Sequence, residues 1–580
     1  MRIILAKTAG FCMGVKRAME KVLAIARRTG APIYTYGPLI HNRQVVDMLE
    51  RRGIRARVDF GEAEEGTVLL RAHGVPPGVV ARLEDAGLAV EDGTCPHVLR
   101  SQQSVARRSA QGYDVIIVGD RDHDEVIGLA GHAERDCDII ATAEEAARVP
   151  LGEQVLVVAQ TTFNQEQFEE IVGVLRSRKP DVEVVESICD ATSDRQDEAR
   201  SLAREVDAMV VVGGYHSANT RRLAEIARAT GTPTFHVEAA DDLDLAELGR
   251  YDTVGVTAGA STPSWITWTV MDRIREAPGR RSVAGRLWKA GMSFLFDGNL
   301  YMAAGAAALT YAATKLLGLD LADPWARASL MIAAFAYIFS AYVLARRGQQ
   351  MAGGTAVTRR AAFYRAHPRG MVVACVVFSV VSIAALVPFG WLAVALMGVS
   401  YAMSAGYGRL MSPRSEGPAR RLRNVPASKD LVAAAGWTVV AVLVPVVAAN
   451  GASLYAVVPT AVFVFGLAFI RSVMFDFSDV MADRLLGRET LPALIGVPRA
   501  GRMLALIAGL LVLVLAGAAS TGGFGGRAPL AWWLLLCPGY VLVYLLVFRD
   551  WVTASERRCG AVADGGMLLA GLIALVYALG

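Results

Sequence analysis

The chain has 580 residues, and its 59 Lys and Arg against 55 Asp and Glu leave a net charge of +4. So small a net charge over this length gives no case for nucleic-acid binding. Apolar residues make up 53% of the sequence, but they are unevenly spread. Residues 1–285 mix charged and apolar residues as a soluble protein does, whereas residues from about 298 onward form apolar runs of membrane-spanning length.

Six short apolar segments in the first region predict β-strands, and helix-like segments usually follow them. They are 1–7, 67–73, 113–119, 153–160, 208–214 and 252–259. This alternation is typical of parallel sheets with crossover helices, in which ligands bind beyond the carboxyl ends of the strands. Polar residues lie at these ends: His73, His123, Glu125, Thr161, Ser217, Asn219 and Ser261. We therefore expect an α/β region with one convergent site.

The seven cysteines are an odd number, and Met1–Lys7 reads as a strand rather than a secretory signal peptide. A cytosolic role of thiols in metal binding or catalysis is therefore expected, not a disulfide framework. Cys12, Cys95 and Cys189 each follow a strand-like run, and no CxxC motif supports a zinc ribbon. Three separate thiolates suit a 4Fe–4S cluster with one iron open to substrate, but three buried free cysteines would have the same spacing.

The residues around these cysteines form a specific pattern. The stretches are AGFCMGVKRA, GPLIHNRQVV, RAHGV, DGTCPHV, HDEVIGLAGH, QTTF, ICDATSDRQ, SANTRRL and GASTP, in this order across almost all of residues 1–270. The region resembles the LytB/IspH family, the 4-hydroxy-3-methylbut-2-enyl diphosphate reductases of the non-mevalonate isoprenoid pathway. The resemblance implies three α/β lobes around a central 4Fe–4S cluster. It also implies reductive dehydroxylation of that substrate to isopentenyl and dimethylallyl diphosphate, with a ferredoxin or flavodoxin as electron donor.

The resemblance assigns roles to individual residues. Cys12, Cys95 and Cys189 would ligate iron. The substrate diphosphate and hydroxyl would be bound by His41, His73, His123, Thr162, Ser217, Asn219 and Ser261, while Glu125 donates a proton and Thr161 fixes the substrate and proton network. Two positions depart from the family pattern: Ala218 stands where a second Ser is usual, and Asp122–Asp124 reads DHD where GHP is common.

Nine apolar segments follow in the second region and predict an all-α polytopic membrane domain. They lie at roughly 296–317, 328–345, 371–388, 390–407, 430–449, 453–470, 503–519, 530–548 and 563–580. Basic residues gather in every second loop, at 346–370, 408–429, 471–502 and 549–562. By the positive-inside rule, these loops and the soluble region are cytoplasmic, and the C-terminus lies outside the inner membrane.

An aspartate-rich stretch, DFSDVMADRLLGRETLP, places Asp476, Asp479 and Asp483 at i, i+3 and i+7 on one helical face. Such a face suits Mg²⁺ and, through it, a diphosphate, or is an ordinary solvated face. The stretch resembles the second aspartate-rich motif of the UbiA family of intramembrane prenyltransferases, which also has nine spans. The first motif of that family is missing, because residues 342–354 read YVLARRGQQMAGG without Asp or Asn.

The expected organisation is a reductase domain at 1–278, a basic linker at 279–295 and a UbiA-like membrane domain at 296–580. Three readings of the whole chain stay open. It is a bifunctional isoprenoid enzyme, or a reductase whose membrane half is a catalytically silent anchor or lipid-binding module. The third is a non-catalytic iron–sulfur redox sensor tethered to the membrane.

Overall fold

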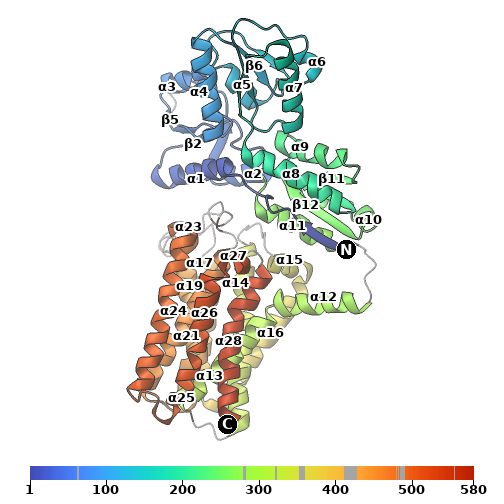
Figure 1. The fold of residues 1–580 in the computed structure, drawn as a ribbon. Helices are drawn as coiled ribbons and strands as arrows, with labels where there is room; N and C mark the ends of the chain where they lie inside the picture. Colours follow the sequence, from blue (N-terminus) through green and yellow to red (C-terminus); the bar gives the residue numbers. More distant parts are fainter. Residues whose placement is uncertain are drawn as a thin grey trace. The chain divides into compact units, whose positions relative to one another are not determined.

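The computed structural model describes residues 1–61, 65–277, 283–319, 323–351, 359–410, 427–477, 480, 483, 490–553 and 556–579. The chain divides into two compact units, an N-terminal unit, Met1–Arg280, and a C-terminal unit, Arg281–Gly580. Strands and helices alternate in the described part of the N-terminal unit, and the described part of the C-terminal unit is helical (Figure 1).

Three four-stranded sheets form the framework of the N-terminal unit, and neighbouring strands in all of them are parallel. The first has the order β1 (Arg2–Leu5), β12 (Thr253–Ala258), β10 (Ala208–Val212) and β11 (Thr234–Val237). The second has β3 (Ile54–Arg57), β2 (Ile33–Tyr36), β4 (Thr67–Leu69) and β5 (Ala89–Glu91). The third has β7 (Asp138–Ile140), β6 (Asp114–Val118), β8 (Val155–Ala159) and β9 (Glu183–Val185). The expected α/β class is confirmed.

Helices of the N-terminal unit connect these strands. They are α1 (Met13–Arg28), α2 (Arg43–Glu50), α3 (Pro77–Asp85), α4 (Pro96–Ala110), α5 (Asp124–Ala130), α6 (Ala143–Ala146), α7 (Gln165–Arg178), α8 (Asp190–Glu205), α9 (Ala218–Ala229), α10 (Leu245–Leu248) and α11 (Ser264–Ile274), with a short 3₁₀ turn η1 (Ala240–Asp242). Helices on both faces explain why all five residues of β8 and of β10 are buried. The strands β1 and β12 come from opposite ends of the unit and pair with Ile4 opposite Gly255.

All six strands predicted from apolar runs are present, as β1, β4, β6, β8, β10 and β12. Sequence reasoning missed the other six, and five of these, β3, β5, β7, β9 and β11, are edge strands. Edge strands here have three or four residues, most of them only partly buried. Their apolar signal is correspondingly weak.

The C-terminal unit is built from helices around one apolar core. They are α12 (Val283–Phe296), α13 (Leu300–Leu317), α14 (Pro324–Met351), α15 (Arg359–Ala366), α16 (Pro368–Ala384), α17 (Trp391–Leu410), α19 (Ser428–Thr438), α20 (Val444–Ala448), α21 (Leu454–Asp476), α23 (Leu491–Ile495), α24 (Val497–Ser520), α25 (Ala528–Leu534), α26 (Leu536–Leu546), α27 (Arg549–Thr553) and α28 (Glu556–Leu579). Two 3₁₀ turns, η2 (Val387–Phe389) and η4 (Gly525–Arg527), join helices, and a π-helical segment, η3 (Val439–Leu443), lies between α19 and α20.

Seven helical segments in the described residues are long and apolar enough to cross a membrane. They are Pro324–Ala345, Pro368–Phe389, Ser428–Ala448, Leu454–Asp476, Val497–Ser520, Gly525–Leu546 and Arg557–Leu579. The remaining two predicted spans coincide with α13 and α17, which are not among the seven, and the apolar part of α17 is the shorter segment Trp391–Gly406. A multi-helical membrane region is supported, and the count of nine spans stays a prediction.

Most of the predicted basic linker at 279–295 is helical, because α12 begins at Val283 and ends at Phe296. Large apolar residues in this segment recur at positions 287, 288, 294 and 295, which is a helical spacing. Together with the basic residues, this spacing makes the segment an amphipathic helix, and its role as a linker stays a prediction.

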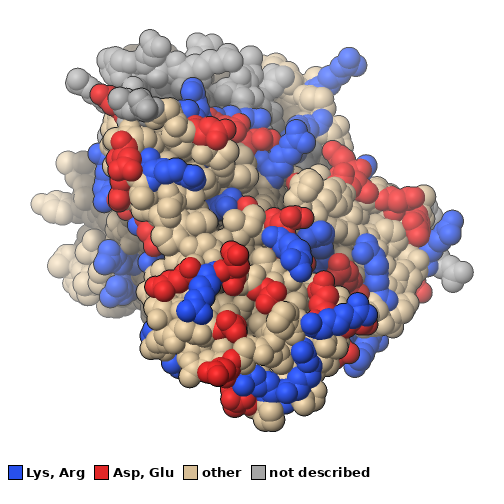
Figure 2. Space-filling view, turned by 90° about the horizontal axis from the view of Figure 1, so that it is seen from above, with Lys and Arg blue, Asp and Glu red and all other residues tan. Residues whose placement is uncertain are grey.

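The face of the molecule seen in Figure 2 carries basic and acidic side chains interspersed over the same area. Charges of both signs mixed in this way are typical of a solvated protein surface. This agrees with the small net charge of +4 over the whole sequence.

Candidate active site

Every predicted site residue of the N-terminal unit follows the carboxyl end of a strand. Cys12 follows β1, His41 β2, His73 β4, Cys95 β5, His123 and Glu125 β6, Thr161 and Thr162 β8, Cys189 β9, Ser217 and Asn219 β10, and Ser261 β12. Carboxyl ends of parallel strands meet at one edge of their sheet. The polar residues that follow the strands of one sheet therefore lie at the same edge of that sheet.

Each of the three predicted cluster cysteines is the N-cap residue of a helix. The amide of Val15 donates to Sγ of Cys12 at 3.5 Å, and backbone amides in the first turns of α4 and α8 lie near the thiols of Cys95 and Cys189. Burial raises the pKa of the Cys95 and Cys189 thiols, and these amides counteract the rise. A helix N-terminus stabilises negative charge, so all three sulfurs are placed where a thiolate ligand is favoured.

Gly14, in the first turn of α1, lies against two of these thiols. A Cβ atom at this position would lie 2.6 Å from Sγ of Cys95 and 4.0 Å from Sγ of Cys12. Among the described residues, the one set of three His, Cys, Asp or Glu ligand atoms within 4.8 Å of one another is formed by histidines. The cysteine sulfurs are therefore spread more widely than the ligands of a single ion, as a multi-iron cluster requires.

Arg195, on α8, brings a buried positive charge to the cysteines. Its side chain donates to the carbonyls of Gly10 at 2.8 Å and Ala191 at 2.7 Å, and the residue is 5% exposed. Burial lowers the pKa of Arg195, while the nearby Cys12 and Cys189 raise it. Its hydrogen-bond acceptors are neutral carbonyls, and its charge therefore acts on the nearby thiols as well as on the carboxylates of Asp194 and Glu198.

The backbone amides of the cysteines tie them to other strand ends. The amide of Cys12 donates to the carbonyl of Ala260, that of Cys95 to Ala72 and that of Cys189 to Thr161, with N···O distances of 3.1, 2.9 and 3.2 Å. Ala260 directly precedes Ser261, and Ala72 directly precedes His73. The cysteines and the predicted substrate-binding residues are therefore parts of one site.

Three histidines from two sheets form a compact cluster. Their ring centroids lie 4.6 Å apart for His41 and His73, 5.5 Å for His73 and His123, and 5.8 Å for His41 and His123. Nε2 of His41 and Nδ1 of His73 are buried and have no hydrogen-bond partner among the described residues. Buried polar atoms without partners are costly unless a ligand satisfies them. These nitrogens are therefore candidate ligand contacts.

Burial determines the protonation of this cluster. It lowers the pKa of His123 to about 4, and it lowers the pKa values of His41 and, more strongly, His73. The neighbouring Asp124 opposes this fall for His41 and His123. All three rings are therefore neutral at pH 7, and each offers one N–H donor and one acceptor nitrogen.

Glu125 is a buried carboxyl group, 1% exposed, held by one residue. The amide of Thr161 donates to Oε1 at 2.7 Å, and the Thr161 hydroxyl lies 2.9 Å from Oε2. Burial raises the pKa of Glu125 to about 7, although both Thr161 contacts lower it. A carboxyl group with such a pKa both holds and releases a proton near neutral pH.

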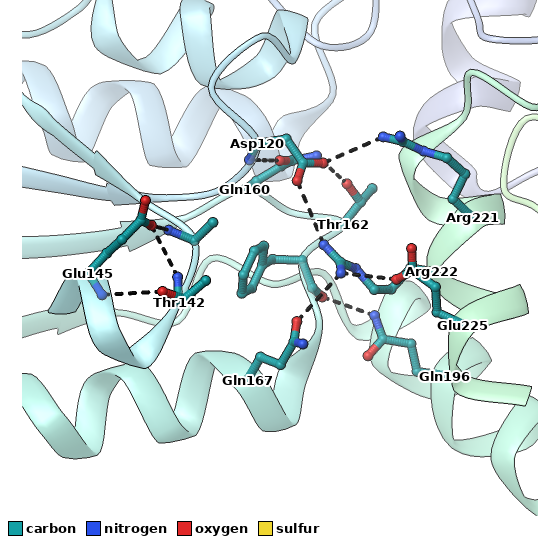
Figure 3. Close-up of polar contacts among 12 residues, drawn as sticks. Asp120, Thr142, Glu145, Gln160, Thr162, Gln167, Gln196, Arg221, Arg222 and Glu225 are labelled. Carbon is teal, nitrogen blue, oxygen red and sulfur yellow. Dashed lines mark hydrogen bonds and ion pairs between the residues drawn. The ribbon is translucent and has the colours of Figure 1, made fainter. Parts of the chain in front are cut away.

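Thr162, in contrast, takes part in a different network. Its hydroxyl accepts from Nε2 of Gln160 at 2.8 Å, and Oε1 of Gln160 accepts from the amide of Asp120 at 3.0 Å. Figure 3 shows the Asp120 carboxylate reaching toward two arginines of α9, Arg221 at 3.8 Å and Arg222 at 3.9 Å. The Thr162 hydroxyl therefore lies next to the contact between Asp120 and the arginines of α9, and its predicted role in substrate binding stays a prediction.

Comparison with known proteins agrees with this geometry. The family described as LytB protein matches residues 3–275. The 4-hydroxy-3-methylbut-2-enyl diphosphate reductase of Geobacter sulfurreducens (strain ATCC 51573 / DSM 12127 / PCA) is 45% identical over 284 residues, 48% of this chain and 99% of that protein. The chain belongs to the LytB family. Its C-terminal unit lies outside the part covered by these LytB matches.

Two solved structures are also similar to parts of this chain. One is the E-1-hydroxy-2-methyl-but-2-enyl-4-diphosphate reductase from Plasmodium falciparum, at 28% identity and a TM-score of 0.46, covering 48% of this chain and 89% of that one. The other is a UbiA homolog from Aeropyrum pernix K1, at 14% identity and a TM-score of 0.39, covering 48% of this chain and 98% of that one.

The start of α9 carries the next group of candidate residues of this LytB family site. Ser217 is its N-cap, and its hydroxyl accepts from the amide of Thr220 at 3.4 Å. Asn219 is 4% exposed, and neither side-chain atom has a partner among the described residues. Ala218, where a second Ser is usual in the LytB family, is buried as well. Asn219 is therefore the open polar group of this helix start, and Ser261 is buried at the end of the neighbouring β12.

The second departure from the family pattern has a structural counterpart. Asp124 forms an ion pair with Arg71, with 2.7 Å between Oδ2 and Nη1. The Arg71 guanidinium also lies over the ring of Tyr36 at 5.8 Å. Sequence reasoning did not select Arg71, although its place two residues before His73 was a usable signal. The second Asp of the DHD sequence therefore adds a carboxylate near the histidines, and this carboxylate pairs with the buried Arg71.

The predicted aspartate motif of the C-terminal unit is only partly described. Asp479 lies outside the described residues, whereas Asp476 and Asp483 are each 5% exposed. Lys429, on α19, forms an ion pair with Asp476. The alternative of a solvated acidic face is therefore wrong for Asp476 and Asp483. Whether the three aspartates share one face stays a prediction.

Proposed function

We propose that the N-terminal unit reduces 4-hydroxy-3-methylbut-2-enyl diphosphate to isopentenyl and dimethylallyl diphosphate. The observation that carries this proposal is a set of three backbone hydrogen bonds. In these bonds the amides of the three N-cap cysteines donate to carbonyls at the strand ends that bear Ser261, His73 and Thr161. Family membership and relatives that are named as this reductase support the same activity.

Cys12, Cys95 and Cys189 are the proposed ligands of a 4Fe–4S cluster. The wide spacing of the sulfurs, the amides of the helix starts and the space kept by Gly14 fit such a group. When bound, the cluster would supply electrons and a Lewis-acidic iron for removal of the hydroxyl group. A ferredoxin or flavodoxin is the proposed electron donor.

The three histidines and the start of α9 are the proposed diphosphate site. Neutral imidazoles donate N–H groups without a fixed charge, and unpartnered atoms of His41, His73 and Asn219 are buried where a ligand can satisfy them. Ser217 and Ser261 add hydroxyl donors. Substrate binding would thus replace missing hydrogen bonds, which favours an anion rich in acceptor oxygens.

Glu125 is the proposed proton donor. The overall change takes up two electrons and two protons, breaks the C–O bond, forms a C–H bond and releases water. Glu125 would deliver one proton to the leaving hydroxyl oxygen, and its raised pKa keeps part of the carboxyl groups protonated near pH 7. Thr161 would hold the carboxyl group in place through both of its contacts.

Anaerobic purification and assay of the whole chain test this proposal. We expect about four irons per chain with a 4Fe–4S spectrum, and conversion of 4-hydroxy-3-methylbut-2-enyl diphosphate under reducing conditions. Zinc in place of iron would contradict the cluster, and a loaded cluster without turnover would favour the redox-sensor reading.

For the C-terminal unit we propose a membrane anchor or lipid-binding module with a UbiA-like arrangement of helices. Lys429 already supplies a positive charge to Asp476, and the segment 342–354 has no acidic residue to complete a metal site. Arg471, on the same helix as Asp476, is paired with Asp564 and donates to the Tyr342 hydroxyl at 3.0 Å. Each of these ion pairs gives a buried carboxylate a positive partner within the protein, although Oδ2 of Asp476 has no hydrogen-bond partner among the described residues.

Prenyl transfer remains the competing function of this unit, and Mg²⁺ is its proposed cofactor. Mg²⁺-dependent transfer to a lipophilic acceptor that is lost in Asp479→Asn would establish it and overturn the anchor proposal. We propose that the unit spans the inner membrane with the N-terminal unit on the cytoplasmic side, as the alternating basic loops predict.

A further inference from the structure

Helix α12 presents an apolar face to solvent. The exposed fractions are 68% for Leu287, 72% for Trp288, 49% for Phe294 and 37% for Leu295. At 3.6 residues per turn, these four residues and Gly291 fall within an arc of about 120°. Large apolar side chains on one side of a helix need a partner that removes them from water.

The sequence around this helix gives the chemistry of that partner. Residues 277–296 contain Arg280, Arg281, Arg286 and Lys289 but no Asp or Glu. An amphipathic helix that combines Trp and Leu with several basic residues is typical of the interface of a membrane with anionic lipids. An acidic protein surface would account only for the basic residues, and a purely apolar protein surface only for the apolar ones.

Contacts within the C-terminal unit fix α12 at one end of the helical bundle. Phe294 packs against Phe363 and His367, with ring centroids 5.1 and 5.4 Å apart. Just beyond α12, Asp297 forms an ion pair with Arg557 near the start of α28. From there α13 enters the bundle, and Figure 1 shows α12 lying crosswise to α13 and α28.

Exposed aromatic residues gather at the other end of the bundle. Trp325, Trp391 and Tyr455 are 79%, 80% and 82% exposed, and each lies at the start of a helix, α14, α17 or α21. The helix α14 starts where the chain has crossed the bundle through α13. Exposed Trp and Tyr at helix ends are typical of a membrane–water interface. The two ends of the bundle thus carry the two interfaces.

We propose that α12 lies in the headgroup region of the lipid bilayer, with Leu287, Trp288, Phe294 and Leu295 toward the acyl chains. The partner is an anionic lipid surface. The inference rests on the C-terminal unit spanning a membrane and is independent of the reductase activity.

The test uses the full chain in nanodiscs of phosphatidylcholine and phosphatidylglycerol. Part of the phosphatidylglycerol carries a diazirine near the carbonyl end of one acyl chain, and mass spectrometry maps the adducts after illumination. Helix α16, whose Val373 and Val376 are 62% and 58% exposed, serves as the internal reference for lipid contact. We expect adducts on both α16 and residues 283–296.

A double variant, Leu287→Ser with Trp288→Ser, should lower the adducts on α12 at least about tenfold relative to α16, because it removes apolar area from the inserted face. The matched control is Val58→Ser, which alters a 52% exposed apolar residue of the N-terminal unit. It should change the yield of lipid adducts neither on α12 nor on α16. Adducts on α16 without adducts on α12 would overturn the proposal. Absence of adducts on α16 as well would instead contradict the membrane-spanning role of the unit, on which the proposal rests.

Discussion

The backbone amide of Cys189 donates to the carbonyl of Thr161 at 3.2 Å. The same Thr161 contacts both carboxylate oxygens of Glu125, at 2.7 and 2.9 Å. One residue at the end of β8 therefore positions a proposed iron ligand and the proposed proton donor together. A shift of this strand end would move both groups, so the proposed iron ligand and the proposed proton donor are mechanically coupled.

Glu125→Gln should lose at least about 100-fold in turnover, because the amide carries no acidic proton. The cluster spectrum should be unchanged. In the native chain the pKa of Glu125 is raised to about 7, so the donor is protonated below this pH and activity should fall as pH rises through it. The pH profile of kcat checks this expectation, and Glu84→Gln, at an exposed position of α3, is the control. Unchanged turnover would remove Glu125 from the mechanism.

Gly14→Ala should prevent cluster assembly. Its Cβ would lie 2.6 Å from Sγ of Cys95, a distance that forces the thiol to move. Iron content and the visible spectrum after anaerobic reconstitution measure the loss. Gly173→Ala is the matched helical control, since a Cβ there has no neighbour within 4 Å. Full iron content in Gly14→Ala would contradict the proposal that Gly14 keeps space for the cluster.

Arg195→Gln should make the reduction potential of the cluster more negative, because a positive charge that favours the added electron is lost. A change on the order of 1–2 kcal/mol per electron is expected for a charge at this kind of distance and burial. Arg195→Lys keeps the charge and should restore most of the potential. An EPR-monitored redox titration measures it. Equal potentials in both variants would assign Arg195 a purely structural role in bonding Gly10 and Ala191.

Asp124→Asn should lower KM for the diphosphate substrate about fivefold, the effect of removing roughly 1 kcal/mol of repulsion. The substitution removes a carboxylate near the histidines and breaks the ion pair between Arg71 and Asp124. The measurement is KM at fixed pH and ionic strength. Asp122→Asn, in the same loop and exposed, is the control. A raised KM would mean that Asp124 is needed to hold the loop.

Lys429→Gln should destabilise the C-terminal unit by roughly 3 kcal/mol, because it leaves the buried carboxylate of Asp476 without its cation. Thermal unfolding in detergent measures the effect, and Mg²⁺ should stabilise the variant more than the native chain. Lys315→Gln, on α13, is the control. Equal stabilisation of the native chain by Mg²⁺ would contradict the metal-free arrangement and favour prenyl transfer.

Sequence patterns determined the class of both regions. Apolar runs such as those of β8 and β10 are continuous because both faces of these strands are buried, and this pattern is local enough to be read from the chain. The same holds for the helices of the C-terminal unit. Edge strands and the amphipathic α12 were not predicted, because one-sided burial or mixed composition weakens the pattern.

The order of motifs, through its resemblance to the LytB/IspH family, assigned the cysteines, the histidines and Glu125 to one site. Only the tertiary structure decided how they are held together. The backbone hydrogen bonds from Cys12 to Ala260 and from Cys189 to Thr161 join residues that are far apart in sequence. The raised pKa of Glu125 follows from burial, which no local sequence pattern encodes. Contacts across the fold, such as Arg71 with Asp124 and Lys429 with Asp476, exist because packing brings distant charges into surroundings of low polarity, where an unpaired charge is costly.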